Sequence, residues 1–244
     1  MESFQSGNIL VKLAQTEEEK KGLWKLRYFD LILEYDKDKV SEIEEDKDEY
    51  DEVCDHLIAI DLTTNEVVGS YRLIKKSHIK NIGKFLSEEG FNLEPLNKYE
   101  LLEVGRAVVK EEYRDSAIIN LLWKGLIKYA VSEEVEYMIG SASFHGNNPS
   151  DYKETLSYLY DNYLSPEEIR CKVNGKSSSP LKLVDNYDEE QAKKGLPPVI
   201  KGYLRLGATI GDGAYIDVSF NSVDVLIVLK IKEINERYLR KFLS

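Results

Sequence analysis

Apolar residues recur with two different spacings along the chain, and the alternation predicts strands and helices in turn. Residues 8–15 form a short β-rich run that predicts a first strand. Residues 16–35 predict a helix, because apolar positions fall near one face and Thr16 and Glu19 have the spacing of a capping box. Residues 55–74 predict a hairpin, since two β-rich runs flank the turn-forming "TTNE".

The remainder of the chain continues this alternation. Strands are expected at about 100–109, at 136–144 and within 215–231, and helices at the ranges 116–131, 148–164, 165–170, 199–208 and 235–242. Ser165 is the expected N-cap of the helix at 165–170. Gly207 is the expected end of the helix at 199–208. This order favours an α/β (α+β) fold, a mixed sheet covered by helices, in one domain over 1–244 with an elaborated C-terminal third from about 165.

Composition narrows the class of protein. Of 244 residues, 42% are hydrophobic and 32% charged, which is typical of a globular domain. No apolar run is long enough for a membrane span, and the first residues do not resemble a signal peptide. Two cysteines, Cys54 and Cys171, give neither a disulfide framework nor metal-ligand spacing. We therefore expect a cytoplasmic protein without a metal.

Charge is distributed unevenly. The net charge of −11 argues against a nucleic-acid partner. The acidic segment at 34–55 is too polar to pack and predicts a mobile loop or short helix. The segment 72–84 carries five basic residues and no acid. It is either a solvated loop and helix face or a docking patch for an acidic partner.

The stretch "ELLEVGRAVVKEEYRDSAII", residues 100–119, combines an apolar strand pattern with charged residues. It places Glu103 and Arg106 inside an expected core strand and then begins a helix. The first N–H groups of a helix have no partners within it and lie at its positive end, so residues 114–119 can bind a phosphate.

This stretch resembles the Gcn5-related N-acetyltransferase (GNAT) superfamily, whose signature joins a strand to a helix through V-x-x-x-Y-R-G-x-G. Val109, Tyr113 and Arg114 match it, whereas Ala117 and Ile119 occupy the places of glycines. The resemblance implies a mostly antiparallel twisted sheet flanked by helices. The missing glycines favour a single pantetheine phosphate over a whole coenzyme A. The implied donor-binding residues are Val108, Val109, Arg114, Ser116, Ala117, Ile118 and Ile119.

Scattered charged residues resemble one branch of that superfamily, the acyl-homoserine-lactone synthases. In order they are Arg27, Asp48, Asp51, Asp61, Arg72, Glu103 and Arg106. "SFHGNNP", the segment 196–229 and "RYLRKFL" look like the ornithine-lipid acyltransferases, also called haemolysin-like, and related N-acyl amino acid synthases. That group has a proline where this chain has His145.

The implied reaction moves a long or 3-hydroxylated acyl chain to the α-amine of an amino acid such as ornithine or glycine, giving an N-acyl amino acid, a lyso-aminolipid. The donor would be acyl-carrier protein or acyl-coenzyme A as co-substrate, with no bound cofactor. Glu103 and Arg106 are the candidate catalytic residues, Glu103 as base and the N–H groups near 107–109 as oxyanion donors. Trp123 and Phe144 are candidates for the acyl pocket.

Further roles complete this hypothesis. The charged residues Arg27, Asp48, Asp51, Asp61 and Arg72 would bind the acceptor or organise the N-terminal segment. The basic segment 72–84 would dock an acyl-carrier protein, and a peripheral membrane contact stays open. Weaker candidates are His145 as a helper, Tyr160 as an acid, and Lys201 and Arg205 for the acceptor carboxylate.

Several alternatives compete with this hypothesis. The charged set can be a buried ion-pair network that shapes the fold without chemistry. The enzyme can instead be an acyl-homoserine-lactone synthase or an acetyl-coenzyme A acetyltransferase. In a different class, it can be an inactive acyl-binding module.

Overall fold

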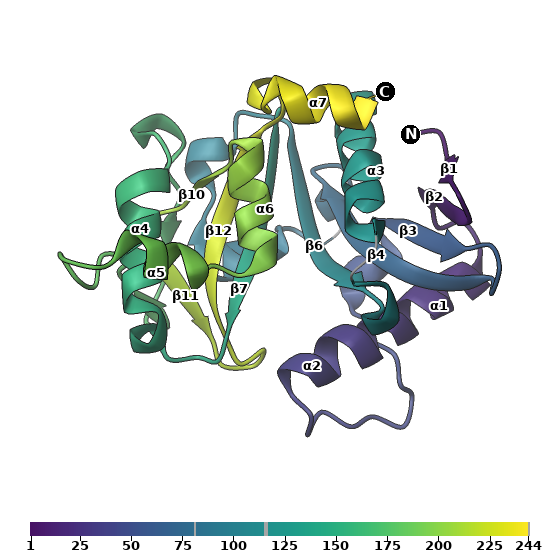
Figure 1. Cartoon of the computed structure of the whole chain (residues 1–244), viewed down its shortest axis with the longest axis horizontal. Helices are drawn as coiled ribbons and strands as arrows, with labels where there is room; N and C mark the ends of the chain where they lie inside the picture. Colours follow the sequence, from purple (N-terminus) through teal and green to yellow (C-terminus); the bar gives the residue numbers. More distant parts are fainter. Residues whose placement is uncertain (81, 115–116, 244) are drawn as a thin grey trace. The chain divides into compact units, whose positions relative to one another are not determined.

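A computed structural model describes residues 1–80, 82–114 and 117–243 and is shown in Figure 1. The strands are β1 Phe4–Ser6, β2 Ile9–Leu13, β3 Asp55–Asp61, β4 Glu66–Lys75, β5 Phe91–Asn92, β6 Leu101–Val109, β7 Tyr137–His145, β8 Lys172–Val173, β9 Ser178–Ser179, β10 Thr209–Ile210, β11 Ala214–Asp217 and β12 Ser222–Lys230. The helices are α1 Glu17–Arg27, α2 Leu33–Tyr35, α3 Ile118–Ser132, α4 Lys153–Tyr163, α5 Glu189–Lys194, α6 Pro198–Leu206 and α7 Glu236–Leu243.

Short helical turns connect these elements. A π-helical turn, η1 Tyr28–Ile32, joins α1 to α2. The 3₁₀ turns are η2 Glu49–Glu52, η3 His78–Lys80, η4 Leu86–Glu89, η5 Glu94–Leu96, η6 Glu111–Tyr113, η7 Pro149–Tyr152, η8 Glu167–Ile169 and η9 Ile231–Glu233. No helix among the described residues is both long enough and apolar enough to cross a bilayer.

The chain divides into two compact units. The first unit comprises residues 1–83, 104–135 and the C-terminal stretch from 237, and the second comprises 84–103 and 136–236. Strand β6 therefore gives its first three residues to the second unit and the others to the first. The single domain expected over 1–244 stays a prediction.

In the first unit, β1 to β4 form an antiparallel meander, and β6 follows β4. Neighbouring residues of β3 point to opposite faces of this sheet. Ile58 packs with Trp24 of α1, whereas Leu57 lies against Gly125 of α3. Helices α1 and α3 thus cover opposite faces, and the apolar residues of β3 are buried on both.

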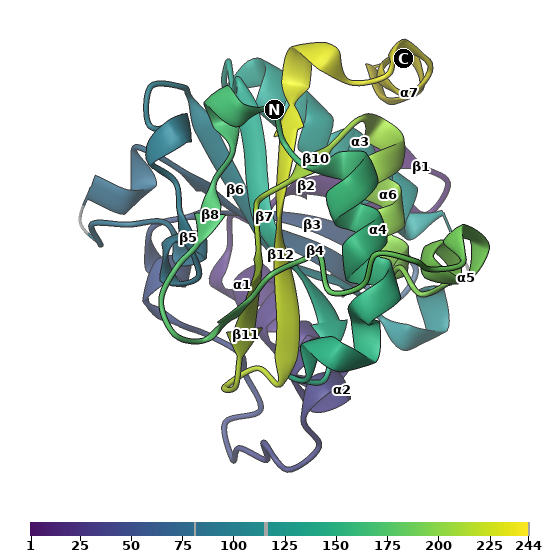
Figure 2. The same ribbon diagram turned by 90° about the vertical axis from the view of Figure 1, so that its left-hand side faces the viewer.

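In the second unit, β7 and β12 form the centre, paired antiparallel along nine residues. Strand β7 also pairs in parallel with Leu101–Glu103 of β6, and β12 pairs with β10 and β11. Figure 2 shows α4 and α6 on one side of β7 and β12, and β5 with β8 on the other. The expected class, a mixed and mostly antiparallel sheet flanked by helices, is confirmed.

Local signals in the sequence explain most element ends. The capping box of Thr16 and Glu19 forms as expected, and Gly207 ends α6 in the left-handed conformation, φ 100°. The expected helix at 165–170 is wrong: only the turn η8 forms. The Ser165 hydroxyl instead bonds to that of Thr209 at 2.8 Å, because a tertiary partner displaces the local cap.

Gly69 allows β4 and α3 to approach each other closely. A Cβ atom at this position would lie 2.9 Å from side-chain atoms of both Ile118 and Leu122. We predict that Gly69→Ala lowers the free energy of unfolding by about 1–3 kcal/mol, measured by denaturant titration, because the interface would be overpacked. Gly105→Ala is the matched control, since its Cβ would meet nothing within 4 Å. Equal stability of the two variants would contradict the prediction.

Candidate active site

Glu103 occupies the last position of the parallel pairing between β6 and β7. Its side chain is buried, and the turn η4 surrounds it with donors. Leu86 N–H donates to Oε2 at 2.8 Å, Ser87 N–H donates to Oε1 at 2.6 Å, and the Ser87 hydroxyl also donates to Oε1. Hydrogen bonds to the ionised form favour it, so these donors offset the cost of burying a carboxylate.

On the face of the sheet that carries Glu103, the second half of β7 is polar. Glu103 pairs with Ile139, and paired residues point to the same face of a sheet. Alternate residues of a strand also share a face, so Glu103 lies on the same face as Ser141, Ser143 and His145. Phe144 points to the opposite face, where it is buried and its ring lies 4.8 Å from that of Tyr152. Within the second unit, therefore, Phe144 does not share the face of the proposed base.

Asp224 of β12 joins this polar face and was missed from the sequence. It lies opposite Ser143, its Oδ1 accepts a hydrogen bond from Ser222 at 2.7 Å, and a second bond comes from Ser143. Burial raises the pKa of Asp224 to about 6, although the two hydroxyls counteract it. The available signal was one acid near the start of the otherwise apolar run "VDVLIVL".

In the first unit, a buried ion pair joins α1 to the acidic segment. Arg27 Nη1 donates to Asp51 Oδ1 at 2.7 Å, and both side chains are almost fully buried. Arg27 Nη2 also lies 3.1 Å from His56 Nδ1, and His56 Nε2 lies 3.3 Å from the Asp51 carbonyl oxygen. Burial opposes the charge of Asp51, but Arg27 and then Arg72 outweigh it and lower its pKa.

Two more arginines extend this network along the acidic segment. Arg72 Nη1 donates to both oxygens of Asp48, at 2.7 and 2.6 Å. Arg106 Nε donates to Asp46 at 2.8 Å, and its Nη2 lies 3.7 Å from Asp48. Arg106 also has a left-handed backbone, φ 50°, which is uncommon for a residue with a Cβ.

The predicted charged residues of the first unit are thus brought together except for one. Asp61 accepts a hydrogen bond from the Tyr113 hydroxyl at 2.8 Å and lies at the far end of β3 from His56. The expectation that the acidic segment is too polar to pack is wrong for η2, where Asp51 and Tyr50 are buried. Pairing with arginines makes this burial tolerable.

Asp51, Cys54 and His56 offer ligand atoms within 4.8 Å of one another, which raises the question of a metal. The arrangement does not favour one. Arg27 and Arg72 place positive charge beside these atoms, and the pKa of Cys54 rises to about 12 through burial and Asp51, which disfavours a thiolate. His56 already uses both ring nitrogens.

The expected phosphate turn is partly visible. Ala117 is the N-cap of α3, its side chain makes no capping bond, and the first turn has no acid. Arg114 donates to Val109 O at 3.1 Å and to Glu34 at 2.7 Å. Ser116 lies outside the described residues. Among the other donor candidates, Ile118 and Val108 are buried, Val109 and Ile119 are partly buried, and Ala117 is exposed.

The basic segment 72–84 is less available than its sequence implies. Arg72 is buried, so it cannot belong to a docking surface. Lys75 pairs with Glu133 at 2.5 Å, and Lys84 lies 3.6 Å from Glu89. The sequence pattern missed Glu133 because this residue comes from a distant stretch of chain.

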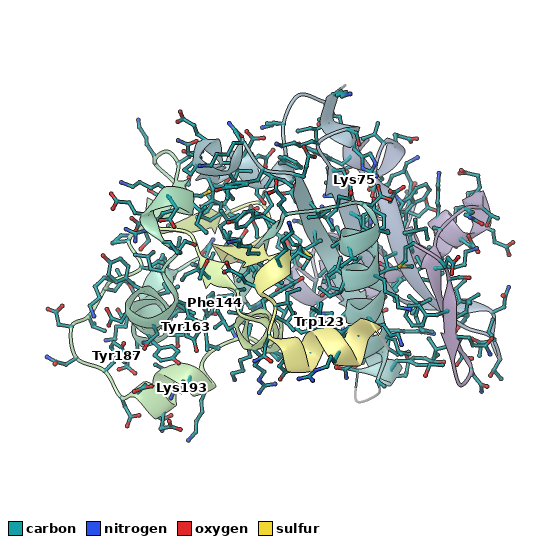
Figure 3. All side chains as sticks on the ribbon, turned by 90° about the horizontal axis from the view of Figure 1, so that it is seen from above. Lys75, Trp123, Phe144, Tyr163, Tyr187 and Lys193 are labelled. Atoms are coloured by element: carbon teal, nitrogen blue, oxygen red, sulfur yellow. The ribbon has the colours of Figure 1, made fainter. Side chains whose placement is uncertain are left out.

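The remaining candidates have structural partners. Trp123, labelled in Figure 3, donates to the Tyr71 hydroxyl at 3.1 Å. Its ring lies edge-on to that of Phe242 of α7. Lys201 donates to the Lys194 carbonyl at 3.1 Å. The exposed candidates are His145, Tyr160 and Arg205.

Comparison with known proteins identifies the class. The Acetyltransferase (GNAT) domain model matches residues 26–124. A solved coenzyme A-dependent acyl-homoserine lactone synthase, BjaI, has the same fold, with a TM-score of 0.51 at 14% identity, covering 93% of this chain and 81% of that one. The domain match and the shared fold thus define the class of this chain as GNAT-like.

Relatives identify the family. The L-ornithine N(alpha)-acyltransferase of Rhodobacter capsulatus is 34% identical over 198 residues, 78% of this chain and 76% of that protein. The protein of the same name from Brucella abortus is 33% identical over 247 residues, 96% of this chain and 88% of that one. The chain belongs to the L-ornithine N(alpha)-acyltransferase family.

The buried His56 gives a test of the ion network. Burial, and then Arg27, lower its pKa to about 4, whereas a histidine in the unfolded chain titrates near about 6.5. Between these pH values, the proton binds to His56 in the unfolded chain and not in the folded one. The free energy of unfolding therefore decreases as the pH falls. We predict that this group removes up to about 3 kcal/mol of stability between pH 6.5 and 4.

Denaturant titrations of the wild type and His56→Gln across this pH range measure the effect. The difference between the two pH slopes isolates the histidine, and parallel slopes would contradict the prediction. His145→Gln is a matched control, because it makes the same substitution at an exposed position.

Proposed function

We propose that the enzyme transfers an acyl group from a carrier thioester to the α-amine of L-ornithine, giving an Nα-acyl ornithine and a free thiol. The observation that carries this proposal is the full-length similarity to proteins of that activity, 33% identical over 96% of this chain in one case. The buried Glu103 beside η4 supports it, since an amine acceptor needs a base.

The proposed chemistry begins with the ornithine ammonium. Glu103 takes a proton from the α-ammonium, directly or through one water, which frees the nitrogen lone pair for attack on the thioester carbonyl. A C–N bond forms, the C–S bond breaks, and the thiolate leaves with a proton from the nitrogen. Pairing of β6 with β7 extends over Leu101–Glu103, so the proposed oxyanion donors are those N–H groups between Val104 and Val109 that do not face β4.

The acyl donor is proposed to be an acyl-carrier protein. The first turn of α3 is free of acids and begins at Ala117, which suits one pantetheine phosphate. Side chains at Ala117 and Ile119 leave less room than glycines for the larger diphosphate of coenzyme A. Such donors are cytoplasmic, and the proposal places the enzyme in that compartment.

The charged network of the first unit is proposed to hold the acidic segment in place. Arg27, Arg72 and Arg106 each bind a different aspartate, so the segment is fixed at three points. Arg106 is then a positioning residue, because its guanidinium pairs with Asp46 and Asp48.

The activity test offers the purified enzyme matched acyl-carrier-protein and acyl-coenzyme A thioesters, with ornithine, glycine or S-adenosylmethionine as acceptor. Mass spectrometry of the products is expected to find Nα-acyl ornithine, formed fastest from the carrier protein. Formation of acyl-homoserine lactone, or of no acylated product from any pair, would overturn the proposal. A faster reaction with acyl-coenzyme A would overturn only the choice of donor.

Glu103→Gln tests the base. We expect turnover to fall by a factor of about 10²–10⁴, with loss of the acidic limb from the pH profile of kcat/KM. Ser87→Ala is the control: it keeps the carboxylate and removes one donor, so it reports the effect of loosening η4. Equal losses in the two variants would make Glu103 only an anchor for the turn.

A further inference from the structure

Asp224 is a buried acid that the proposed mechanism does not use. Its side chain is 6% exposed and lies in a strand whose other central residues are apolar. Among the described residues, no lysine, arginine or histidine nitrogen lies within 4 Å of its carboxylate. Its partners are the hydroxyls of Ser143 and Ser222, and the charge that acts on it is that of Asp217, another acid.

A buried carboxylate with only hydroxyl partners destabilises the fold unless a cation binds to it. A buried carboxylate without a cation costs free energy, which is why its pKa rises to about 6. Hydroxyl groups can rotate to donate to the carboxylate, but they do not neutralise it. A residue kept at this cost is a candidate for ligand recognition.

The same segment of chain lies over Glu103 and over the strand beside Asp224. Leu86 binds Glu103, and four residues later Gly90 lies against the ring of Tyr215, where a Cβ atom would come within 2.7 Å of the ring. Tyr215 is the residue of β11 opposite Asp224. Residues 86–90 therefore cross the polar face from one acid to the neighbour of the other.

We propose that Asp224 binds the side-chain ammonium of the acceptor, with Ser143 and Ser222 orienting its carboxylate. This inference rests on the proposed function. It names the residue that distinguishes a diamino acid from an amino acid without a side-chain amine. Ornithine has two amines, and a carboxylate partner keeps the distal one protonated and therefore not nucleophilic. The α-amine, whose pKa in a chain terminus is about 8 against about 10.4 for a side-chain amine, is left to react.

The spacing of the two acids fits such a ligand. Glu103 pairs with Ile139 and Asp224 with Ser143, which are four residues apart along β7. With about 3.3 Å per residue and two strand spacings of about 4.8 Å, their Cα atoms are about 16 Å apart. An extended ornithine separates its nitrogens by about 6 Å, and two hydrogen bonds of about 2.8 Å extend this to about 12 Å. The two side chains bridge the difference.

The test compares ornithine with norvaline, which has the same carbon chain without the distal amine. For the wild type we expect kcat/KM to favour ornithine by about 10- to 100-fold, the worth of a hydrogen bond to a charged group. In Asp224→Asn this ratio should fall to less than about threefold, mainly through slower reaction with ornithine, and fragmentation of the product should reveal Nδ-acylation. Asp185→Asn, an exposed position of the same unit, should keep the ratio of the wild type.

A second variant keeps the charge and moves it. Asp224→Glu advances the carboxylate by one methylene group, so the preferred acceptor should shift from ornithine to the shorter 2,4-diaminobutyrate. Thermal unfolding checks that each variant folds; the neutral asparagine resembles the protonated acid that burial favours. If both variants fold and both keep the ornithine preference of the wild type, this inference alone is overturned. If the asparagine variant does not fold, an unchanged preference in the glutamate variant overturns it. A wild type that acylates no ornithine would overturn the proposed function together with it.

Discussion

The ion pair between Arg27 and Asp51 is the constraint on which the first unit depends. It joins α1 to a segment of chain whose composition would otherwise keep it in solvent. Neither charge is tolerable in the core by itself, because an unpaired buried charge costs several kcal/mol. The pair also fixes the position of Asp48, which binds Arg72 and lies near Arg106. The three arginines and their aspartates therefore form one network, in which Arg27, Asp51 and Arg72 are buried and the other members are half-buried.

The second unit handles its buried acids in a different way. Glu103 is stabilised by two backbone N–H groups and a hydroxyl, and Asp224 by hydroxyls. Neutral donors leave the charge in place, so both carboxylates can still interact with a cation. The contrast separates the two sets: arginines neutralise the aspartates of the first unit, whereas the acids of the second face a polar strand surface. This difference is the reason that we propose chemistry for the second set and positioning for the first.

Much of the fold could be predicted from local patterns. The hairpin of β3 and β4, the helix after β6 and the stop at Gly207 all follow from spacing and turn chemistry. The helix expected at 165–170 did not follow, since Ser165 has a hydrogen-bond partner more than forty residues away. Similarly, the charges of segment 72–84 indicated a basic surface, yet Arg72 is buried by aspartates that precede it by more than twenty residues. Local sequence cannot identify partners at such separations.

The sequence by itself determined the family, the order of the elements and the identity of the charged residues around the candidate site. Tertiary structure decided which of them meet. Register placed Ser143 opposite Asp224 and turned Phe144 to the other face, and pairing left Asp61 with Tyr113 outside the arginine network. The physical reason is that a strand's alternation specifies two faces but not which strand pairs with it. The role of a lone acid in an apolar strand can be inferred only when the residues on the neighbouring strands are known.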